Sequence, residues 1–188
     1  DFNKVTIEGE TLKEHQSAYY IMMNKSQGIL SATKDDQHET AIDLIEEDYK
    51  NQLHIAGRLD RSSTGLLILT NDGRWSRQIT EPKKKIPKTY LVETVYAISP
   101  GTPALFSKGI YFAYEGITTS PAQIELLAEN RCLLTIYEGR YHQIKRMFAA
   151  AGNRVQALHR LSMGKIKLDE NLKPGEYRAL TEDEINSV

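Results

Sequence analysis

The sequence predicts a single α+β domain, because strand-like apolar runs alternate along it with amphipathic helical segments. No long linker and no internal repeat interrupts the 188 residues, a length that suffices for one sizeable core. The hydrophobic and charged fractions, 40% and 26%, are those of an ordinary globular protein. No apolar run approaches the roughly 18 residues of a membrane span, and there is no signal-peptide pattern, so we expect a cytoplasmic protein.

Two strands and two helices are expected in the first half of the chain. The apolar run 19–23 (YYIMM) predicts a buried strand that ends at the turn signal 24–28. Residues 40–49 carry apolar side chains among acidic ones in a pattern that indicates a helix capped at its first residue. The run 66–70 predicts a second strand, and after a tight turn a short helix is expected over 75–79.

Two further strands and a helix are expected in the second half. Residues 89–96 (TYLVETVY) are rich in β-branched and aromatic side chains, and 132–137 (CLLTIY) form a similar run. Residues 142–151 place apolar side chains at i, i+3, i+4 and i+7, a helical core stripe that the following Gly-Asn pair terminates. The stripe consists of Ile144, Met147, Phe148 and Ala151, and it leaves four polar residues to the surface, His142, Gln143, Lys145 and Arg146.

Disulfide and zinc chemistry have no basis in the sequence. The only cysteine, Cys132, lies in an apolar strand, so we expect a reduced core thiol. The five histidines are scattered, and no Cys/His cluster has the spacing of a zinc site.

Positive charge is concentrated in two windows, although the net charge of the chain is only −1. Residues 54–90 hold eight Lys/Arg against three Asp/Glu, and residues 139–167 hold seven against none. The two windows together carry +12, which leaves −13 for the rest of the chain. Such a separation is expected of a surface that binds phosphate groups. The alternative is that these residues point in different directions as solvated charges.

Residues 57–66 (GRLDRSSTGL) place Asp60 between two arginines, immediately before an apolar strand. A carboxylate on such a loop, close to guanidinium groups, can stay ionised and accessible to a substrate. Taken alone, the pattern is more typical of an aspartate in a turn or at a helix cap. The whole string, however, resembles the catalytic motif of the bacterial ribosomal-RNA pseudouridine synthases.

Two more strings extend this resemblance. Residues 88–90 (KTY) are similar to the second motif of the family, which implies that Tyr90 lies against the target base. Residues 138–147 (EGRYHQIKRM) are similar to the third, in which a basic residue, here Lys145, pairs with the catalytic aspartate. The resemblance implies a mixed, mostly antiparallel β-sheet with flanking helices, and a catalytic set of Asp60, Tyr90 and Lys145.

Residues 141–152 (YHQIKRMFAAAG) and 174–178 (PGEYR) resemble the branch of the family that modifies small-subunit RNA, at uridine 516 of 16S rRNA. The implied partner is 16S rRNA or an assembling small ribosomal subunit, bound by a monomer. The large-subunit branches resemble the chain less, and a 23S rRNA synthase is the alternative. One departure from the family is Ser26, which replaces the proline of a turn and does not touch the chemistry.

The N-terminal residues are expected to lie outside the catalytic domain. Residues 5–10 (VTIEGE) resemble the tail of the S4-like RNA-binding domain that often precedes these catalytic domains, although an ordinary extension would look alike. The sequence also begins without Met, so we expect that it has been trimmed. We therefore expect an N-terminal tail over residues 1–17 and the pseudouridine synthase catalytic domain over residues 18–188.

Isomerisation of uridine to pseudouridine breaks the N1–C1′ bond and rejoins the base through C5. Nothing is oxidised and no phosphate is transferred, so neither a cofactor nor a metal is expected. The resemblance implies Asp60 as the nucleophile, and the point of attack is left open between C6, C1′ and the 2′ position. Enclosure would raise the pKa of its carboxyl group and a nearby ammonium would oppose that shift, so we expect Lys145 within about 4 Å.

The target base must leave the RNA stack to reach such a site. The resemblance implies that Arg58 fills the vacated space, with a plain phosphate contact as the alternative. The lysine run 83–85 is expected to bind the RNA backbone without reading bases, unless it is merely a solvated loop. The expected RNA-contacting side chains are Arg58, Arg61, Lys83, Lys84, Lys85, Lys88, Arg140, His142 and Arg146.

Three other functions compete with this interpretation. A non-catalytic RNA-binding domain would have no reason to keep Asp60, Tyr90 and Lys145 together. A calcium site is suggested by the oxygen-bearing side chains from Asp60 onward, but an EF-hand loop needs glutamate at its twelfth position, where this chain has Asn71. A hydrolase would need a suitably spaced histidine partner, and the sequence offers none.

Overall fold

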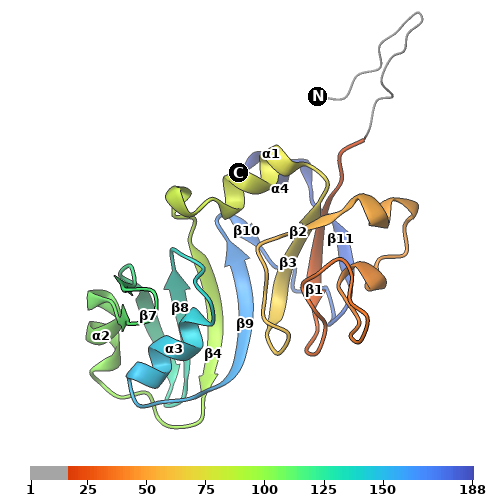
Figure 1. Cartoon of the computed structure of the whole chain (residues 1–188). Helices are drawn as coiled ribbons and strands as arrows, with labels where there is room; N and C mark the ends of the chain where they lie inside the picture. Colours follow the sequence, from red (N-terminus) through yellow and green to blue (C-terminus); the bar gives the residue numbers. More distant parts are fainter. Residues whose placement is uncertain (1–16) are drawn as a thin grey trace, which may run out of the picture.

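The computed structural model describes residues 17–188, which form one large mixed β-sheet with helices packed against it (Figure 1). The strand order is β11-β1-β3-β9-β4-β8-β7, with β2 paired to β3 and β10 paired to β9. The pairs of this sheet are antiparallel except for β3 with β9, so the predicted α+β fold with a mostly antiparallel sheet is confirmed. The strands are β1 (Tyr20–Lys25), β2 (His54–Ala56), β3 (Thr64–Thr70), β4 (Lys88–Thr94), β7 (Gln123–Ala128), β8 (Arg131–Ile136), β9 (Val155–Met163), β10 (Ile166–Lys167) and β11 (Tyr177–Ala179).

Helices lie against both halves of the sheet. Figure 1 shows α2 and α3 beside the half formed by β4, β8 and β7, whereas α1 and α4 lie together near β2 and β10. A small separate hairpin of β5 (Tyr111–Phe112) and β6 (Ile117–Thr118) follows α2. The helical segments are α1 (Gly73–Thr80), α2 (Thr102–Lys108), α3 (Gln143–Ala150), α4 (Glu182–Asn186) and the 3-10 turns η1 (Ile42–Leu44), η2 (Asp48–Gln52) and η3 (Pro82–Lys84).

The two halves of the sheet meet at a short parallel contact. β3 pairs with β9 at two positions, Thr64 with His159 and Gly65 with Arg160. Gly65 has a φ of +105°, and a Cβ at this position would lie 2.3 Å from the carbonyl oxygen of Arg160. Glycine is therefore required for this close approach of the two backbones. The contact brings β9 to the end of the loop that carries Asp60.

The core covers both faces of β3. Residues 66–69 are 0% exposed, so neither face of this strand meets solvent. One cluster on this strand extends to Phe106 of α2 and Phe148 of α3, whose rings meet edge to face with centroids 4.9 Å apart. The other cluster includes Trp75 of α1. Burial on two sides fixes β3, and with it the start of the strand where the Asp60 loop ends.

Most of the expected elements are present. The run 66–70 lies in β3, and the helix expected over 142–151 is α3, with His142 and Ala151 at its ends. Asp72 caps α1 by accepting a hydrogen bond from the Trp75 amide at 3.0 Å. Cys132 is fully buried in β8, and burial raises the pKa of its thiol to about 11, as expected of an inert core cysteine.

The prediction of a helix over residues 40–49 is wrong. Thr40 forms an isolated parallel bridge with Leu30, and after the single 3-10 turn η1 the backbone of Ile45 is extended, with φ −82° and ψ 132°. The apolar residues of the segment are nevertheless buried, Ala41 at 0% and Ile42 at 4% exposure. The spacing of apolar residues therefore reflected burial and not helical structure.

Two further expectations fail at the level of single residues. Gln143, expected on the surface, is 3% exposed, because its amide donates to Glu138 at 3.1 Å. β4 ends at Thr94, two residues before the end of the strand expected over 89–96, and Tyr96 is 62% exposed. β9 was not expected from the sequence, although this strand lies at the centre of the sheet.

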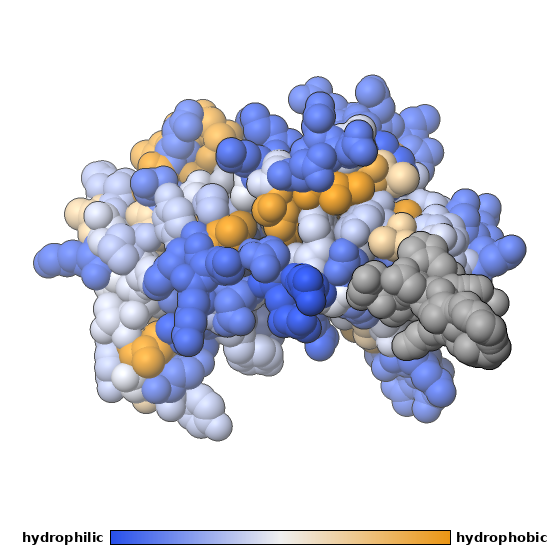
Figure 2. All heavy atoms as spheres, turned by 90° about the horizontal axis from the view of Figure 1, so that it is seen from above, coloured by the Kyte–Doolittle hydropathy of each residue, from blue (hydrophilic) through white to orange (hydrophobic). Residues whose placement is uncertain are grey.

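Hydrophilic residues cover most of the face seen in Figure 2, and hydrophobic residues form smaller patches between them. Within residues 17–188, none of the helices has the length and apolar character needed to cross a membrane. The N-terminal tail expected over residues 1–17 lies outside the described residues, apart from Ser17.

Candidate active site

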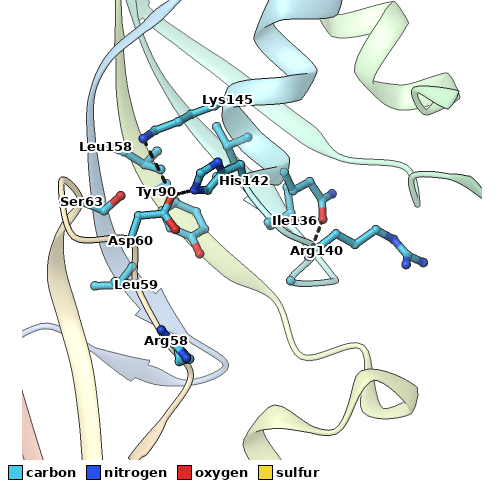
Figure 3. Close-up of a pocket in the computed structure, with 13 residues that line it drawn as sticks. Arg58, Leu59, Asp60, Ser63, Tyr90, Ile136, Arg140, His142, Lys145 and Leu158 are labelled. Carbon is cyan, nitrogen blue, oxygen red and sulfur yellow. Dashed lines mark hydrogen bonds and ion pairs between the residues drawn. The ribbon is translucent and has the colours of Figure 1, made fainter. Parts of the chain in front are cut away.

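Asp60 lies on the loop between β2 and β3, beside the contact between the two halves of the sheet (Figure 3). The loop turns tightly, because the Ser63 amide donates to the Asp60 carbonyl at 3.0 Å. The turn after β1 packs against it, since the Gly28 amide donates to the Arg61 carbonyl at 2.8 Å. The Asp60 side chain is 34% exposed, so its carboxylate is accessible to a substrate.

A buried lysine holds the same loop. Lys25 is 0% exposed, and its ammonium donates to the carbonyl oxygens of Ser26, Arg61 and Ser63 at 3.0, 3.1 and 2.7 Å. Burial lowers the pKa of Lys25 to about 8, and the Asp60 carboxylate partly opposes that shift. No role for this residue was expected from the sequence.

Arg160 holds the loop from β9. The residue is 1% exposed, and its guanidinium donates to the carbonyl oxygens of Gly57 at 2.7 Å and Leu66 at 3.0 Å. These carbonyls precede and follow the Asp60 loop, so one side chain ties both of its ends. From the sequence, Arg160 was expected only to contribute positive charge. The two-residue alternation of β9, with Leu158 and Arg160 buried on one face, is the signal that could have found it.

Two residues from the start of α3 face the Asp60 carboxylate. Lys145 Nζ lies 3.9 Å from Asp60 Oδ2, and His142 Nε2 lies 3.6 Å from the same oxygen (Figure 3). Lys145 also donates to the Ser62 hydroxyl at 3.1 Å. The expected approach of Lys145 within about 4 Å of Asp60 is therefore confirmed.

Both of these basic side chains are partly solvated. Lys145 and His142 are each 37% exposed, so neither forms a deeply buried ion pair with Asp60. Ion pairs of this kind contribute little to stability, roughly 0–1 kcal/mol. His142 is one of the expected RNA contacts, and its ring lies beside Asp60, stacked at 3.9 Å on the ring of Tyr141.

Tyr90 lines the same pocket as Asp60. It lies on β4, is 7% exposed, and its ring lies behind Asp60 in Figure 3. The pocket has a volume of about 90 Å³ and is also lined by Leu59 and Leu158. Arg160 Nη1 donates to the Tyr90 hydroxyl at 3.5 Å, so the residue that holds the loop also reaches the phenol. A carboxylate, a phenol and an apolar wall therefore enclose one small space.

Two of the expected RNA contacts are held in ion pairs with acidic residues. Arg146 makes two hydrogen bonds of 2.7 Å to Glu115, and its guanidinium lies 3.7 Å from the centre of the Phe112 ring. Arg140 donates to the Glu138 carboxylate at 3.1 Å. Both terminal nitrogens of Arg146 and the Nε of Arg140 thus have acidic partners within the protein.

The remaining basic residues have different surroundings. Arg58 and the run 83–85 are exposed, although Lys85 also donates to the Ser120 hydroxyl at 3.2 Å. Lys88 is half-buried, and burial, assisted by the Arg160 guanidinium, lowers its pKa. The two basic windows converge in part, because Arg58 from the first and Lys145 from the second line the Asp60 pocket. Within the described residues, no group of three His, Cys, Asp or Glu side chains could hold a metal ion.

Comparison with known proteins confirms the resemblance. Residues 19–150 match the RNA pseudouridylate synthase family. The chain is 46% identical to ribosomal small subunit pseudouridine synthase A of Salmonella typhimurium, over 99% of this chain and 89% of that protein. The protein of the same name from Pseudomonas aeruginosa is 46% identical over 100% of this chain and 81% of its own length. The protein of the same name from Escherichia coli K12 is 44% identical, over 99% of this chain and 89% of that protein.

A solved structure agrees with the sequence comparison. A crystal structure of a pseudouridylate synthase superposes with a TM-score of 0.88 and 43% identity, covering 98% of this chain and 79% of that one. The fold expected from the three motifs is thereby confirmed.

Proposed function

This chain belongs to the RNA pseudouridylate synthase family, and we propose that it isomerises one uridine of 16S ribosomal RNA, uridine 516, with Asp60 as the nucleophile. It is a ribosomal-RNA pseudouridine synthase, and the names of its relatives specify the small ribosomal subunit. Identities of 44–46% over nearly the whole chain support the transfer of that substrate class. The enzyme acts as a cytoplasmic monomer on 16S rRNA or on an assembling subunit.

The observation that carries this proposal is the grouping of Asp60, Lys145 and Tyr90 around one pocket. Asp60 attacks the extruded nucleotide and the N1–C1′ bond breaks. The free uracil turns between Tyr90 and the apolar wall. C5 then joins C1′, and the bond between Asp60 and the nucleotide breaks, which returns the free carboxylate. The C5 proton then leaves and N1 gains one, so atoms and charge balance without an oxidant. Lys145 keeps the carboxylate ionised while substrate displaces water from it.

The RNA contacts follow from the distribution of free and paired cations. Arg58 stands at the mouth of the pocket and occupies the place that the target base vacates. The exposed run 83–85 and Arg61 bind phosphates, which position the RNA without reading its sequence. Arg140 and Arg146 contribute less, because acidic partners already neutralise them.

The test is site-mapped detection of pseudouridine on 16S and 23S rRNA from cells with and without this protein. One position of 16S rRNA should lose the modification in the deletion strain, and purified protein should restore it. Loss at a 23S position instead would identify a large-subunit enzyme. Unchanged maps together with RNA binding by the purified protein would support a non-catalytic RNA-binding domain.

A further inference from the structure

Three hollows adjoin one another along the Asp60 loop. The pocket of about 90 Å³ holds Asp60 and Tyr90. A second hollow of about 600 Å³ shares Asp60, His142 and Lys145 with that pocket. A third, of about 400 Å³, lies on the other side of Arg58 and shares Arg58 and Tyr90 with it. The reactive pocket is thus flanked on two sides by larger spaces.

The two flanking hollows differ in chemistry. The second is lined by polar and basic groups, among them Arg61, His142 and Lys145. The third has apolar walls from Ile55, Pro82 and Ile86 and a ring from Tyr137, together with charged side chains, among them Lys88, Glu81 and Glu138. Phosphates prefer the first kind of surface, whereas a planar base with an apolar face prefers the second.

We propose that the third hollow binds the base of a nucleotide adjacent to the target uridine. The two nucleotides are joined by one phosphodiester, and the two spaces share the walls formed by Arg58 and Tyr90. The hollow falls in the range of about 300–1,000 Å³ that is typical of small-ligand sites, so a base with its sugar can enter it. The neighbouring base stacks against Tyr137 and Ile86, and Lys88 meets its phosphate.

This subsite rests on the proposed function, because it needs an extruded uridine beside it. Its test uses an rRNA fragment around the uridine that the mapping identifies, and two copies with an abasic residue on either side of that uridine. Binding and kcat/KM for pseudouridine formation are measured for the wild type, Ile86→Ala and Tyr137→Leu. Tyr96→Leu, which removes an exposed ring at the end of β4, is the matched control. Thermal unfolding verifies that each variant is folded.

An abasic residue on one side should lower the affinity and kcat/KM of the wild type about tenfold. Ile86→Ala and Tyr137→Leu should lose a similar factor on the intact RNA and little more on the abasic copy, because both changes remove the same interaction. The subsite would be overturned if the abasic residue still lowered the affinity and kcat/KM of both variants by the full factor. It would also be overturned if neither abasic copy lowered these quantities for the wild type. Loss of binding in Lys88→Ala without any abasic penalty would mean that a phosphodiester fills the hollow. If the pseudouridine maps of 16S and 23S rRNA showed no position that depends on this protein, the proposed function itself would be contradicted.

A separate observation concerns Ser63, and from it we infer that the Ser63 hydroxyl hydrogen-bonds the substrate. Ser63 is 1% exposed and lines the Asp60 pocket, and among the described residues its Oγ has no hydrogen-bond partner. The main chain of Ser63 already fastens the loop, through its amide to Asp60 and its carbonyl to Lys25. A buried hydroxyl without a partner is costly, and it is retained where a ligand supplies the partner.

Ser63→Ala separates this role from a structural one. The variant should unfold at the same or a higher temperature than the wild type, because it removes an unpaired buried hydroxyl. Its kcat/KM should nevertheless fall about tenfold, the loss expected of one substrate hydrogen bond. Unchanged kinetics, or a drop in unfolding temperature that accounts for the lost activity, would overturn the assignment. Ser63→Cys, which keeps the size and a weak donor, should recover part of the loss.

Discussion

Two pairs of basic residues flank the Asp60 loop, and they differ in burial and in what they bind. Lys25 and Arg160 are 0% and 1% exposed and donate to main-chain carbonyls of the loop. Lys145 and His142 are each 37% exposed and face the Asp60 carboxylate. The first pair fixes the backbone, and the second pair surrounds the reactive charge.

Because of this difference, one pair of residues positions the nucleophile and the other pair influences its charge. A buried cation is tolerated only where its hydrogen bonds are well formed, so Lys25 and Arg160 constrain the loop to one geometry. A partly solvated cation constrains little, but it can bias the charge of its neighbour when substrate excludes water. Stability and activity should therefore respond to different substitutions.

Asp60→Asn should give the largest change. The amide keeps the shape of the side chain and removes the nucleophile, so pseudouridine formation should fall by about 10³-fold or more. Folding and RNA binding should be nearly unchanged, because the Asp60 side chain is exposed and the loop is held through its main chain. Single-turnover assays measure the loss of pseudouridine formation, and circular dichroism checks that the variant is folded. Appreciable turnover by a verified sample would end the nucleophile assignment.

Arg160→Met should destabilise the protein more than any change among the exposed cations. It leaves the buried carbonyls of Gly57 and Leu66 without their donor, which should cost about 2–4 kcal/mol of unfolding free energy. Urea denaturation measures this cost, and Arg131→Met, at an exposed position on β8, is the control. A loss below about 1 kcal/mol would mean that the loop keeps its geometry without the arginine.

Lys25 should make stability depend on pH in a direction that can be checked. Its folded pKa is about 8 and its ordinary value is 10.5, so between these pH values the unfolded chain holds a proton that the folded chain has released. The unfolding free energy of the wild type should therefore rise with pH across this window relative to Lys25→Met. The gain should be absent below pH 8 and should reach about 3 kcal/mol by pH 10.5. A difference that shrinks with pH would show that the three carbonyls stabilise the charged form instead.

The contrast between these pairs also shows how far the sequence could be interpreted. The helix α3 and the strand β3 were predictable, because their apolar spacing matches their burial. The approach of Lys145 to Asp60 was predictable only from the motif resemblance, since no local pattern joins residues so far apart. The alternation of β9 could have indicated that Arg160 is buried, but its partners were not predictable, because these carbonyls lie 94 and 103 residues away and leave no mark in the sequence. The segment 40–49 failed for a related reason, since burial by distant elements imitated a helical period.

Lys145→Gln should lower activity about 10- to 100-fold while changing the unfolding free energy by less than about 1 kcal/mol. The ammonium lies 3.9 Å from Asp60, close enough to favour the carboxylate but too solvated to hold the fold together. Lys108→Gln, at an exposed position at the end of α2, should change neither quantity. Weaker RNA binding with an unchanged rate at saturation would assign the lysine to RNA binding instead.

The smallest effect is expected from the exposed lysines that touch neither the loop nor Asp60. Replacing Lys83, Lys84 and Lys85 by alanine should weaken binding of every RNA sequence alike and leave the rate at saturation nearly intact. Each lysine that no longer neutralises a phosphate should reduce the salt dependence of binding by about 0.7 on a single strand, so the slope against log salt should become shallower by at most about 2. Alanine at three other exposed lysines, Lys165, Lys167 and Lys173, is the matched control for charge alone. If the triple variant bound RNA normally but turned over slowly, the run 83–85 would shape the neighbouring hollow beside Lys88 and Tyr90. These lysines would then act in the chemistry and not in binding the RNA backbone.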